Sequence, residues 1–378
     1  MKISNIQSFS SDVLLLKITC LAWLVAKVMS FKLWISDRVF PVVPTFDFFS
    51  LPNSVHLALY FVSLLGIIII FFKPQKKIIA FVLAIEVIVC LLDQTRWQPW
   101  QYQYLLTFSF FFFAKDQKQI LQLCYVLIGC TYFFSGLHKF SGSFLYTFWD
   151  TIVLRKILHL DIQAIKNPVI HYMGLIPCFI EIFIGFGFVF FRKKRYLFLM
   201  AIGMHLFIII IYGPFGTNHN NIIVPWNIAM ILYALLFFGQ NELPPFNRLF
   251  FVNDFNKIVF LLIGILPFGS FVGIWDNYLS FNLYSGKTFN LAICTKEQSV
   301  HPEIKHYTSK VINNKYCNGY YLINVNKWTL GELMVPFIPE ERYFKKLKEE
   351  FEIKFSDTDN SFVYYQYPYK KQNIKKVP

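Results

Sequence analysis

The sequence predicts an all-α polytopic membrane bundle of about nine transmembrane helices, with a small C-terminal α+β domain outside the membrane. Three observations predict this fold: the composition, a series of apolar spans, and a change of character after residue 275. The chain has 378 residues, of which 56% are hydrophobic and 45 are Phe, and its mean hydropathy is +0.46. Soluble domains have about 45–50% apolar residues, so the excess indicates surface that faces lipid.

A helix that crosses a bilayer needs about 20 apolar residues, or fewer where protein shields it. The third and fourth apolar spans are short, and they flank a polar hairpin at residues 93–101 into which we expect their helices to extend. The nine spans cover residues 13–34, 54–72, 78–92, 102–114, 120–138, 174–191, 196–213, 222–239 and 257–275.

The formal net charge of +14 is typical of nucleic-acid-binding proteins, but here the basic residues lie in loops between apolar spans. One set of alternating loops is rich in Lys and Arg, and the other set carries few. Cytoplasmic loops carry such an excess, so a bilayer explains the charge and no nucleic-acid partner is expected. The sequence predicts a multi-pass protein of the cytoplasmic (inner) membrane, with a cytoplasmic N-terminus and an extracytoplasmic C-terminal domain. The basic set comprises Lys73, Lys76, Lys77, Lys115, Lys118, Arg192–Arg195 and Arg248.

Two regions outside the apolar spans are predicted to fold. In the loop 140–173, apolar residues recur at helical spacing, which predicts an interfacial amphipathic helix over Trp149–Ala164. Residues 276–378 are predicted to form the α+β domain, beside a membrane domain at 1–275, with a helix over Glu340–Phe351. Strands are expected at Phe281–Leu283, Phe289–Ile293, Tyr320–Val325 and Phe362–Tyr367, and a basic tail (Lys370, Lys371, Lys375 and Lys376) is expected to be disordered.

The seven Cys residues show no metal-ligand spacing, so no metal site is expected. Five of them lie in apolar spans, where a Cys is most often a buried small hydrophobe. Cys294 and Cys317 lie in the C-terminal region and are able to pair if that region faces an oxidising compartment.

Glu86, Glu181 and His205 lie in the middle of apolar spans, and Lys139 ends another. Each costs about 2.5–3.5 kcal/mol at the bilayer centre, so we expect them to face the bundle interior and to share a polar site. Desolvation favours the free amine of a lysine, and a free amine is a competent general base. The simpler alternatives are a Lys139 that reaches the headgroups from its helix end and neutral, hydrogen-bonded packing residues at the other three positions.

The polar hairpin carries Asp93, Arg96, Trp97 and Trp100. Asp93 and Arg96 lie three residues apart and are able to pair locally. The alternative is a capped interfacial turn, with Trp97 and Trp100 as anchors in the aromatic belt. A second polar segment, Asn218–Asn221, is most simply a turn.

The segment Asp93-Gln-Thr-Arg-Trp97-Gln-Pro-Trp100-Gln-Tyr102-Gln-Tyr104 resembles the Asp-x-Thr-x-Trp-x-x-His-x-Tyr-x-Tyr stretch of the vitamin K-dependent gamma-glutamyl carboxylases. The segment Tyr132-Phe-Phe-Ser-Gly136-Leu-His138-Lys139-Phe resembles their Tyr-Phe-x-Ala-Gly-x-Lys-Lys-Leu. Glu181 and His205 resemble an acidic residue and a His in the spans that follow. Over residues 78–286 the chain is similar to the HTTM membrane family, to which the bacterial relatives of the carboxylases belong.

The resemblance implies a membrane enzyme in which Lys139 is the base, with His205 and Glu181 beside it as catalytic residues. The carboxylases use their second Lys of this pair as the base toward reduced vitamin K. A reduced quinone is therefore the implied cofactor, and a peptide or lipid on the outer face is the implied target. Asp93, Arg96, Trp97, Trp100 and His138 are the implied substrate- or cofactor-binding residues.

Two departures support an alternative, non-catalytic function. Trp100 stands where the carboxylases carry a His, and the predicted outer domain of about 100 residues is much shorter than theirs. The chain would then be a membrane scaffold, a subunit of an envelope complex or a helper in peptide maturation, with a membrane-protein partner. A transporter is disfavoured, because no paired broken helices in two related halves are visible.

Overall fold

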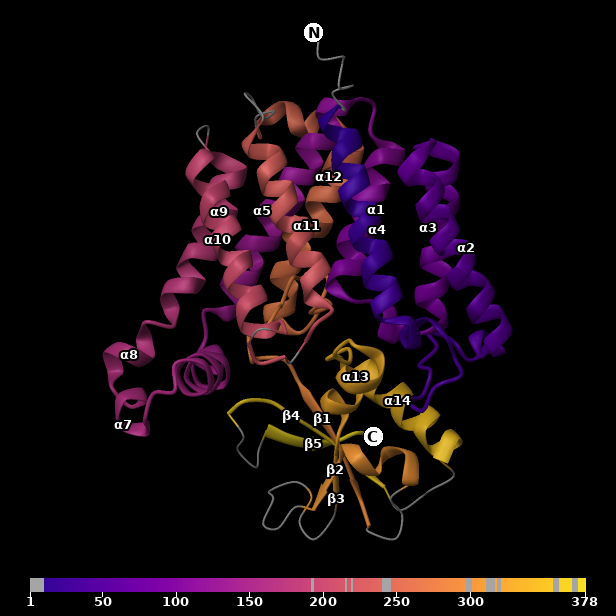
Figure 1. Ribbon diagram of the computed structural model, residues 1–378, viewed down its shortest axis with the longest axis vertical. Coiled ribbons are helices and arrows are strands. Elements are labelled where there is room, and N and C mark those ends of the chain that lie inside the picture. The colour runs from indigo at the N-terminus through magenta and orange to yellow at the C-terminus, as the bar shows by residue number, and fades with distance from the viewer. Residues whose placement is uncertain are drawn as a thin grey trace, which may run out of the picture.

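The structure, a computed structural model, describes residues 10–191, 194–214, 216–218, 220–239, 246–296, 301–310, 317, 321–355, 360–368 and 373–378. These residues form a bundle of long helices at one end of the molecule and a five-stranded sheet with two helices at the other (Figure 1). The mostly helical fold with a small C-terminal α+β part agrees with the prediction.

A helix lies at each of the nine predicted spans. α4 begins at Pro99, within the hairpin as expected, because proline suits the first helical position. α3 ends at Leu92 and does not extend into the hairpin, so that part of the prediction is wrong. α1 ends earlier than predicted, and the 3₁₀-helix η1 (Phe31–Trp34) follows it. The helices are α1 (Ser11–Met29), α2 (Asn53–Phe72), α3 (Lys76–Leu92), α4 (Pro99–Phe113), α5 (Gln117–Lys139), α9 (Leu175–Phe190), α10 (Arg195–Tyr212), α11 (Ile223–Phe238) and α12 (Asp254–Phe260), which continues as π-helical η6 (Leu261–Ile265) and 3₁₀-helical η7 (Leu266–Val272).

Within the described part of the chain, five helical segments are long and apolar enough to cross a membrane. They include α2, α5 and α10, together with the segments Pro168–Phe190 and Asp254–Val272. Exposed large hydrophobic residues such as Phe61, Leu65 and Phe72 stand on the outer faces of these helices. These helices give the chain the character of a membrane protein.

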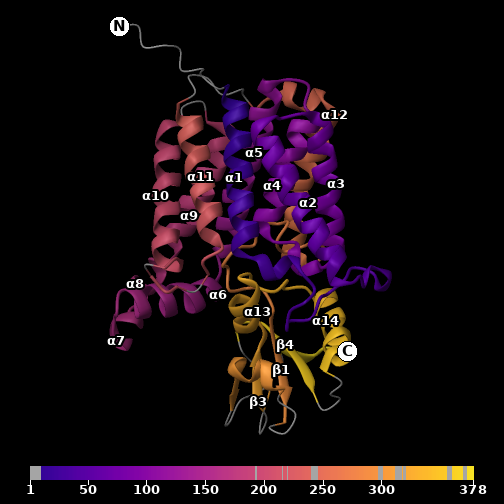
Figure 2. The same cartoon turned by 45° about the vertical axis from the view of Figure 1, so that its right-hand side comes forward.

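The predicted basic loops and the C-terminal sheet lie at opposite ends of the bundle. α1 begins at the end far from the sheet, and the turn between α2 and α3 lies at that same end (Figures 1 and 2). The loop after α1 and the loop between α3 and α4 lie at the sheet end. The alternation of loops therefore agrees with the sequence pattern, which groups the hairpin at 93–98 with the C-terminal region.

The long loop after α5 folds as an arm beside the bundle (Figure 1). The predicted helix over Trp149–Ala164 is confirmed over its first half by the π-helical segment η4 (Leu145–Ile157) and is interrupted after it, where His159 has a left-handed φ of 52°. Asp161 then caps a new short helix by accepting a hydrogen bond from Ala164 N. The remaining elements of the arm are α6 (Gly142–Phe144), α7 (Ile162–Ile165) and α8 (Pro168–Tyr172).

The C-terminal sheet has the order β2-β3-β1-β4-β5 and every pairing in it is antiparallel. Three of the predicted strands are confirmed as β1 (Asn290–Thr295), β3 (Tyr321–Asn324) and β4 (Ser361–Tyr365). The predicted helix is confirmed as α14 (Glu341–Phe355). The helix α13 (Val325–Leu333), the 3₁₀-helix η9 (Pro302–Tyr307) and strands β2 (Thr308–Lys310) and β5 (Ile374–Lys376) were not predicted.

Two predictions in this region are wrong. The segment Phe281–Leu283 is a turn, because Phe281 and Tyr284 both have left-handed φ values, of 56° and 53°. Lys375 and Lys376 belong to β5 rather than to a disordered tail, since β5 pairs with β4. Lys370 and Lys371 lie outside the described residues.

Cys294 and Cys317 form a disulfide, as the sequence allowed. The other five cysteines are free and buried, which confirms them as small core residues.

Small residues allow α5 and α9 to make the most extensive helix contact of the bundle. A Cβ added at Gly136 would lie 2.8 Å from Glu181 Cβ, and one added at Gly185 would lie 2.3 Å from Phe133 N. Close approach of helix backbones through glycine is a common way to pack helices in membranes. The expectation that Gly136 permits close approach is confirmed, and the contact brings Lys139 opposite Glu181.

Candidate functional site

Lys139 and Glu181 form an ion pair between α5 and α9. The ammonium nitrogen lies 2.7 Å from Glu181 Oε2 and 2.8 Å from Oε1, and it also donates to Ser135 Oγ at 2.6 Å. Both residues are buried, at 7% and 5% exposed. Lys139 is therefore held inside the protein, and the alternative in which it extends to the headgroups does not describe this structure.

His205, on α10, lies in a second polar cluster beside this pair. Asn227 Nδ2 donates to Ile223 O, which orients its amide so that Oδ1 faces His205 Nδ1 at 2.7 Å. Nδ1 therefore carries the proton, and Nε2 accepts a hydrogen bond from the Tyr132 hydroxyl at 2.5 Å. The imidazole is therefore held by hydrogen bonds at both nitrogens.

A small cavity of about 40 Å³ joins the two clusters. Lys139, Glu181 and His205 all line it, although they come from three different helices. Tyr132, Ser135 and Lys139 share one face of α5, because residues three and four apart lie above one another on a helix. The three residues predicted to be catalytic are thus brought together around one cavity.

A larger cavity of about 350 Å³ lies next to the small one, between the bundle and the C-terminal region. Trp226, Leu283 and Tyr284 line both cavities. Tyr284 is held in place by a hydrogen bond from Asn220 Nδ2 at 3.0 Å and by contact with the Tyr212 ring. A left-handed φ in a bulky residue is strained, and such strain collects at functional sites.

Glu86 does not belong to this site, so the predicted single polar interior is wrong in this respect. Glu86 pairs with Lys27 of α1 at 3.0 Å, and both side chains are fully buried. Gln101 donates to Glu86 at 2.8 Å, and Ser63 also donates to it. The partner lies in the first apolar span, and neither residue lines either cavity.

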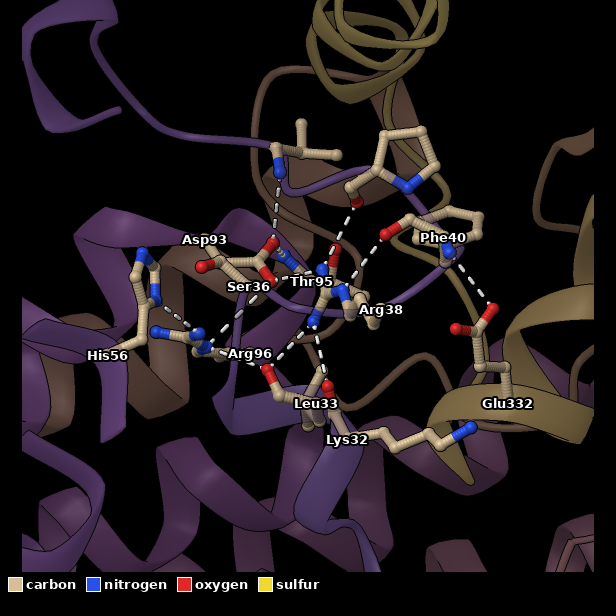
Figure 3. A network of polar contacts seen from close by, with 12 residues as sticks. Lys32, Leu33, Ser36, Arg38, Phe40, His56, Asp93, Thr95, Arg96 and Glu332 are labelled. Carbon is tan, nitrogen blue, oxygen red and sulfur yellow. Dashed lines mark hydrogen bonds and ion pairs between the residues drawn. The ribbon is translucent and has the colours of Figure 1, made fainter. Parts of the chain in front are cut away.

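Asp93 and Arg96 lie in a third network, at the junction between the bundle and the C-terminal region (Figure 3). Arg38 is the nearer partner of Asp93, at 2.6 Å, whereas Arg96 Nε is 3.8 Å away. Arg96 also bonds to His56 at 2.9 Å. The predicted local pair is therefore a minor part of a larger network, and neither residue lines the cavities.

The Asp93 carboxylate also caps the 3₁₀-turn η3 (Gln94–Arg96), since it accepts a hydrogen bond from Thr95 N. Burial on its own would raise the pKa of Asp93. The charges of Arg38 and Arg96, with the hydrogen bonds from Thr95, outweigh burial and hold that pKa below its usual value. Asp93 is thus a fixed anion that organises this junction.

The C-terminal region is fixed to the bundle through the same junction. Glu332 accepts a hydrogen bond from Val39 N at 2.6 Å and one from Phe40 N at 2.9 Å, and Figure 3 shows the second of these. Thr95 and Tyr343 share a hydrogen bond of 3.0 Å between their hydroxyls. These contacts hold α13 and α14 against the loops that end α1 and α3, and so they close one side of the larger cavity.

The remaining predicted binding residues take different positions. Trp100 is buried and lines the larger cavity, so it is not an anchor in an aromatic belt. Trp97 stacks on Tyr102, and His138 stacks on Phe271, with ring centroids 5.0 and 4.2 Å apart. Neither lines either cavity. Of Asn218–Asn221, Asn220 lines the larger cavity, and His219 lies outside the described residues.

Sequence reasoning assigned no role to five residues of the site: Tyr132, Ser135, Trp226, Asn227 and Tyr284. The spacing of residues 132, 135 and 139 on one helical face was a signal that could have found the first two. Asn227 and Tyr284 reach the site only through tertiary packing, which a single sequence does not reveal.

Comparison of the chain with protein-family models, with curated proteins and with solved structures finds no match. In the described residues, no three His, Cys, Asp or Glu side chains are grouped so that they could hold a metal ion. The functional argument is therefore carried by the geometry of the site.

Proposed function

We propose that the chain is an integral membrane enzyme in which Lys139 and Glu181 perform acid–base chemistry on a ligand that approaches from the larger cavity. The observation that carries this proposal is the convergence of Lys139, Glu181 and His205 on one cavity. Ionisable side chains at membrane depth are expensive, and their grouping around a cavity is typical of a functional site.

The chemistry proposed is a proton transfer. Glu181 takes one proton from the Lys139 ammonium along a hydrogen bond of 2.7 Å, which leaves a neutral pair. The free amine then accepts a proton from the ligand, and the resulting ammonium stabilises the ligand anion beside it. Ser135 Oγ keeps the nitrogen oriented during this exchange, because it accepts a third hydrogen bond.

His205 acts as a positioning residue in this scheme. Its Nδ1 is engaged by Asn227 and its Nε2 by Tyr132, so it has no free nitrogen for the ligand. It holds the Tyr132 hydroxyl on the cavity wall, next to Lys139 on the same face of α5. The single proton of that hydroxyl is engaged by Nε2, so the ligand anion is stabilised by the Lys139 ammonium.

The proposal includes nine membrane crossings, with the C-terminal domain on the extracytoplasmic face of the inner membrane. The position of the basic loops far from the sheet and the disulfide between Cys294 and Cys317 support this orientation. The target would be a peptide or a lipid that reaches the cavity from the outer face, as the carboxylase resemblance implies.

The same resemblance implies a reduced quinone. A cavity of about 150 Å³ is needed to hold a benzene ring, and the cavity next to Lys139 is about 40 Å³. A quinone ring does not fit beside the amine in this arrangement. The proposed mechanism therefore includes no step that depends on it.

Mass spectrometry of the products tests the proposal. Peptides and lipids from cells that express the wild-type chain would be compared with those from cells that express Lys139→Met/Glu181→Gln, which removes both charges together. The variant Lys27→Met/Glu86→Gln is the matched control, because this second Lys–Glu pair lines neither cavity. The proposal predicts a product that disappears only in the first variant. A product that persists there, with normal expression and folding, contradicts it.

One observation favours a second candidate, a non-catalytic membrane scaffold. The cavity beside Lys139 has room for a few water molecules only, and Trp226, Leu283 and Tyr284 separate it from the larger cavity. In a scaffold the ion pair would only fix α5 against α9. Purification in mild detergent distinguishes the candidates, since a stoichiometric partner protein without any product would favour the scaffold.

A further inference from the structure

The larger cavity has a lining without charge. Among the described residues, no Asp, Glu, Lys, Arg or His side chain lines it. Its wall includes the aromatic side chains of Trp100, Tyr212, Trp226, Tyr278, Tyr284 and Phe289. Its volume of about 350 Å³ is within the range of small-molecule sites, which is about 300–1,000 Å³.

Three lining residues carry polar atoms that have no hydrogen-bond partner among the described residues. They are Nε1 of Trp100 and Oδ1 of Asn220 and of Asn282. The three residues are 3%, 6% and 4% exposed. Buried polar groups in folded proteins are nearly always paired, so three of them around one cavity indicate a ligand.

These atoms define the chemistry that the ligand must offer. An indole N–H only donates, so Trp100 requires an acceptor, while the two amide oxygens require donors. A hydroxyl group meets both requirements. The terminal torsion angle of asparagine has a broad energy profile, so each amide is able to turn its oxygen toward such a group.

The part of the lining that the structure describes contains no cationic side chain, so the cavity should exclude anionic ligands. A carboxylate or phosphate in this cavity would lose its hydration and gain no cationic partner, which is costly. The ammonium of Lys139 belongs to the adjoining cavity and is already paired with Glu181.

We infer that the larger cavity binds an uncharged, ring-bearing ligand with hydroxyl groups and excludes carboxylates, so that the group presented to Lys139 is not a glutamate side chain. This inference rests on the proposed function for the approach of the ligand to Lys139. The binding itself is a property of the cavity and is measured without any reaction.

A matched pair of probes tests the inference: 4-hydroxybenzyl alcohol, which is neutral, and 4-hydroxybenzoate, which is anionic at pH 7. Each is titrated calorimetrically into the full chain in phosphatidylcholine nanodiscs, with empty nanodiscs as the blank. Saturable binding of the neutral probe, at least tenfold tighter than that of the anion, is expected. Equal binding of the two probes, or no saturable binding of either because the cavity holds water only, overturns the inference.

Substitutions locate the binding. Asn220→Leu, Asn282→Leu and Trp100→Phe each remove one unpartnered atom, and each should weaken the neutral probe about 3- to 10-fold, as expected for one hydrogen bond. Trp226→Phe is the control, because this indole lines the same cavity but its N–H is already bonded to Gln103 Oε1 at 2.9 Å. In each variant, the affinity for the neutral probe is divided by the affinity for the anionic probe. A partial loss of folded protein affects both affinities equally and does not change this ratio. Binding that is insensitive to the first three substitutions contradicts the inference.

The variant Lys139→Met/Glu181→Gln separates this inference from the proposed function. The cavity keeps its lining in that variant, so the neutral probe should bind as it does to the wild type while product formation is lost. Retained binding with retained product would contradict the proposed function only. Lost binding in a folded variant would contradict the inference.

Discussion

Lys139 Nζ lies 2.7 Å from Glu181 Oε2, in a pair that joins α5 to α9 on the wall of a cavity that His205 also lines. The two residues are separated by 42 positions in sequence. Their meeting depends on Gly136 and Gly185, which let the two helices approach closely. The packing of the bundle and the chemistry of the site therefore rest on the same contact.

Removing one member of this pair should destabilise the protein more than removing both. Glu181→Gln leaves the Lys139 ammonium buried without its counter-ion, which costs about 3–5 kcal/mol. Lys139→Met/Glu181→Gln leaves no unpaired charge and should unfold at a higher temperature than Glu181→Gln alone. Thermal unfolding in one detergent measures the order of the three proteins, and a double variant less stable than the single one contradicts the ion-pair account.

Gly136→Ala should separate α5 from α9. The new Cβ would lie 2.8 Å from Cys178 O, Glu181 Cβ and Ile182 N, and overpacking of this kind costs about 1–3 kcal/mol. Gly203→Ala in α10 is the control, since a Cβ there would meet no atom within 4 Å, and alanine should stabilise that helix by about 0.5–1 kcal/mol. A pair of variants with equal melting temperatures would show that the close approach is not needed.

Asp93 should make the free energy of unfolding fall as the pH is lowered into the acid range. Its folded pKa is below its usual value of 3.8, so the unfolded state binds the proton more readily. The contribution is complete above pH 3.8 and is lost as the pH falls through the lower folded value. Asp93→Asn should be less stable near neutral pH, because Arg38 and Arg96 lose their anion, and its unfolding should depend less on pH below this point. The measurement is chemical unfolding as a function of pH, and parallel pH profiles for the two proteins would contradict the assignment.

Glu332 should control how firmly the C-terminal region is held. Glu332→Ala removes the acceptor for Val39 N and Phe40 N, and each such hydrogen bond to a charged group contributes about 1.5–3 kcal/mol. Hydrogen exchange at those two amides should become faster, and exchange within α5 should not change. Glu352→Ala on the exposed face of α14 is the control. Unchanged protection at residues 39 and 40 would show that other contacts carry the junction.

The architecture could be predicted from the sequence because the hydrophobicity of each short segment determines whether that segment is stable in a bilayer. Local composition and periodicity were enough to predict the nine apolar spans, the short helices around the hairpin and the strands β1, β3 and β4. The failures follow from backbone geometry and from tertiary contact. Phe281 and His159 break a predicted strand and a predicted helix through left-handed conformations, which their residue types do not indicate.

The site was also predicted only in part: its ionisable residues were identified from the sequence, but their partners were not. Lys139, Glu181 and His205 stood out because ionisable groups in apolar spans are rare, and the structure brings them to one cavity. The choice of partners did not follow from the sequence. Glu86 is matched by Lys27, and Asp93 by Arg38, across separations of 59 and 55 positions respectively, and only the packed bundle determines such pairs.

A cryo-electron microscopy map of the full chain in lipid nanodiscs tests the central claim most directly. The account predicts density for Lys139 Nζ within hydrogen-bonding distance of the Glu181 carboxylate, on a cavity that His205 lines as well. Density that instead carries the Lys139 side chain out to the lipid headgroups, away from Glu181 and His205, would contradict it.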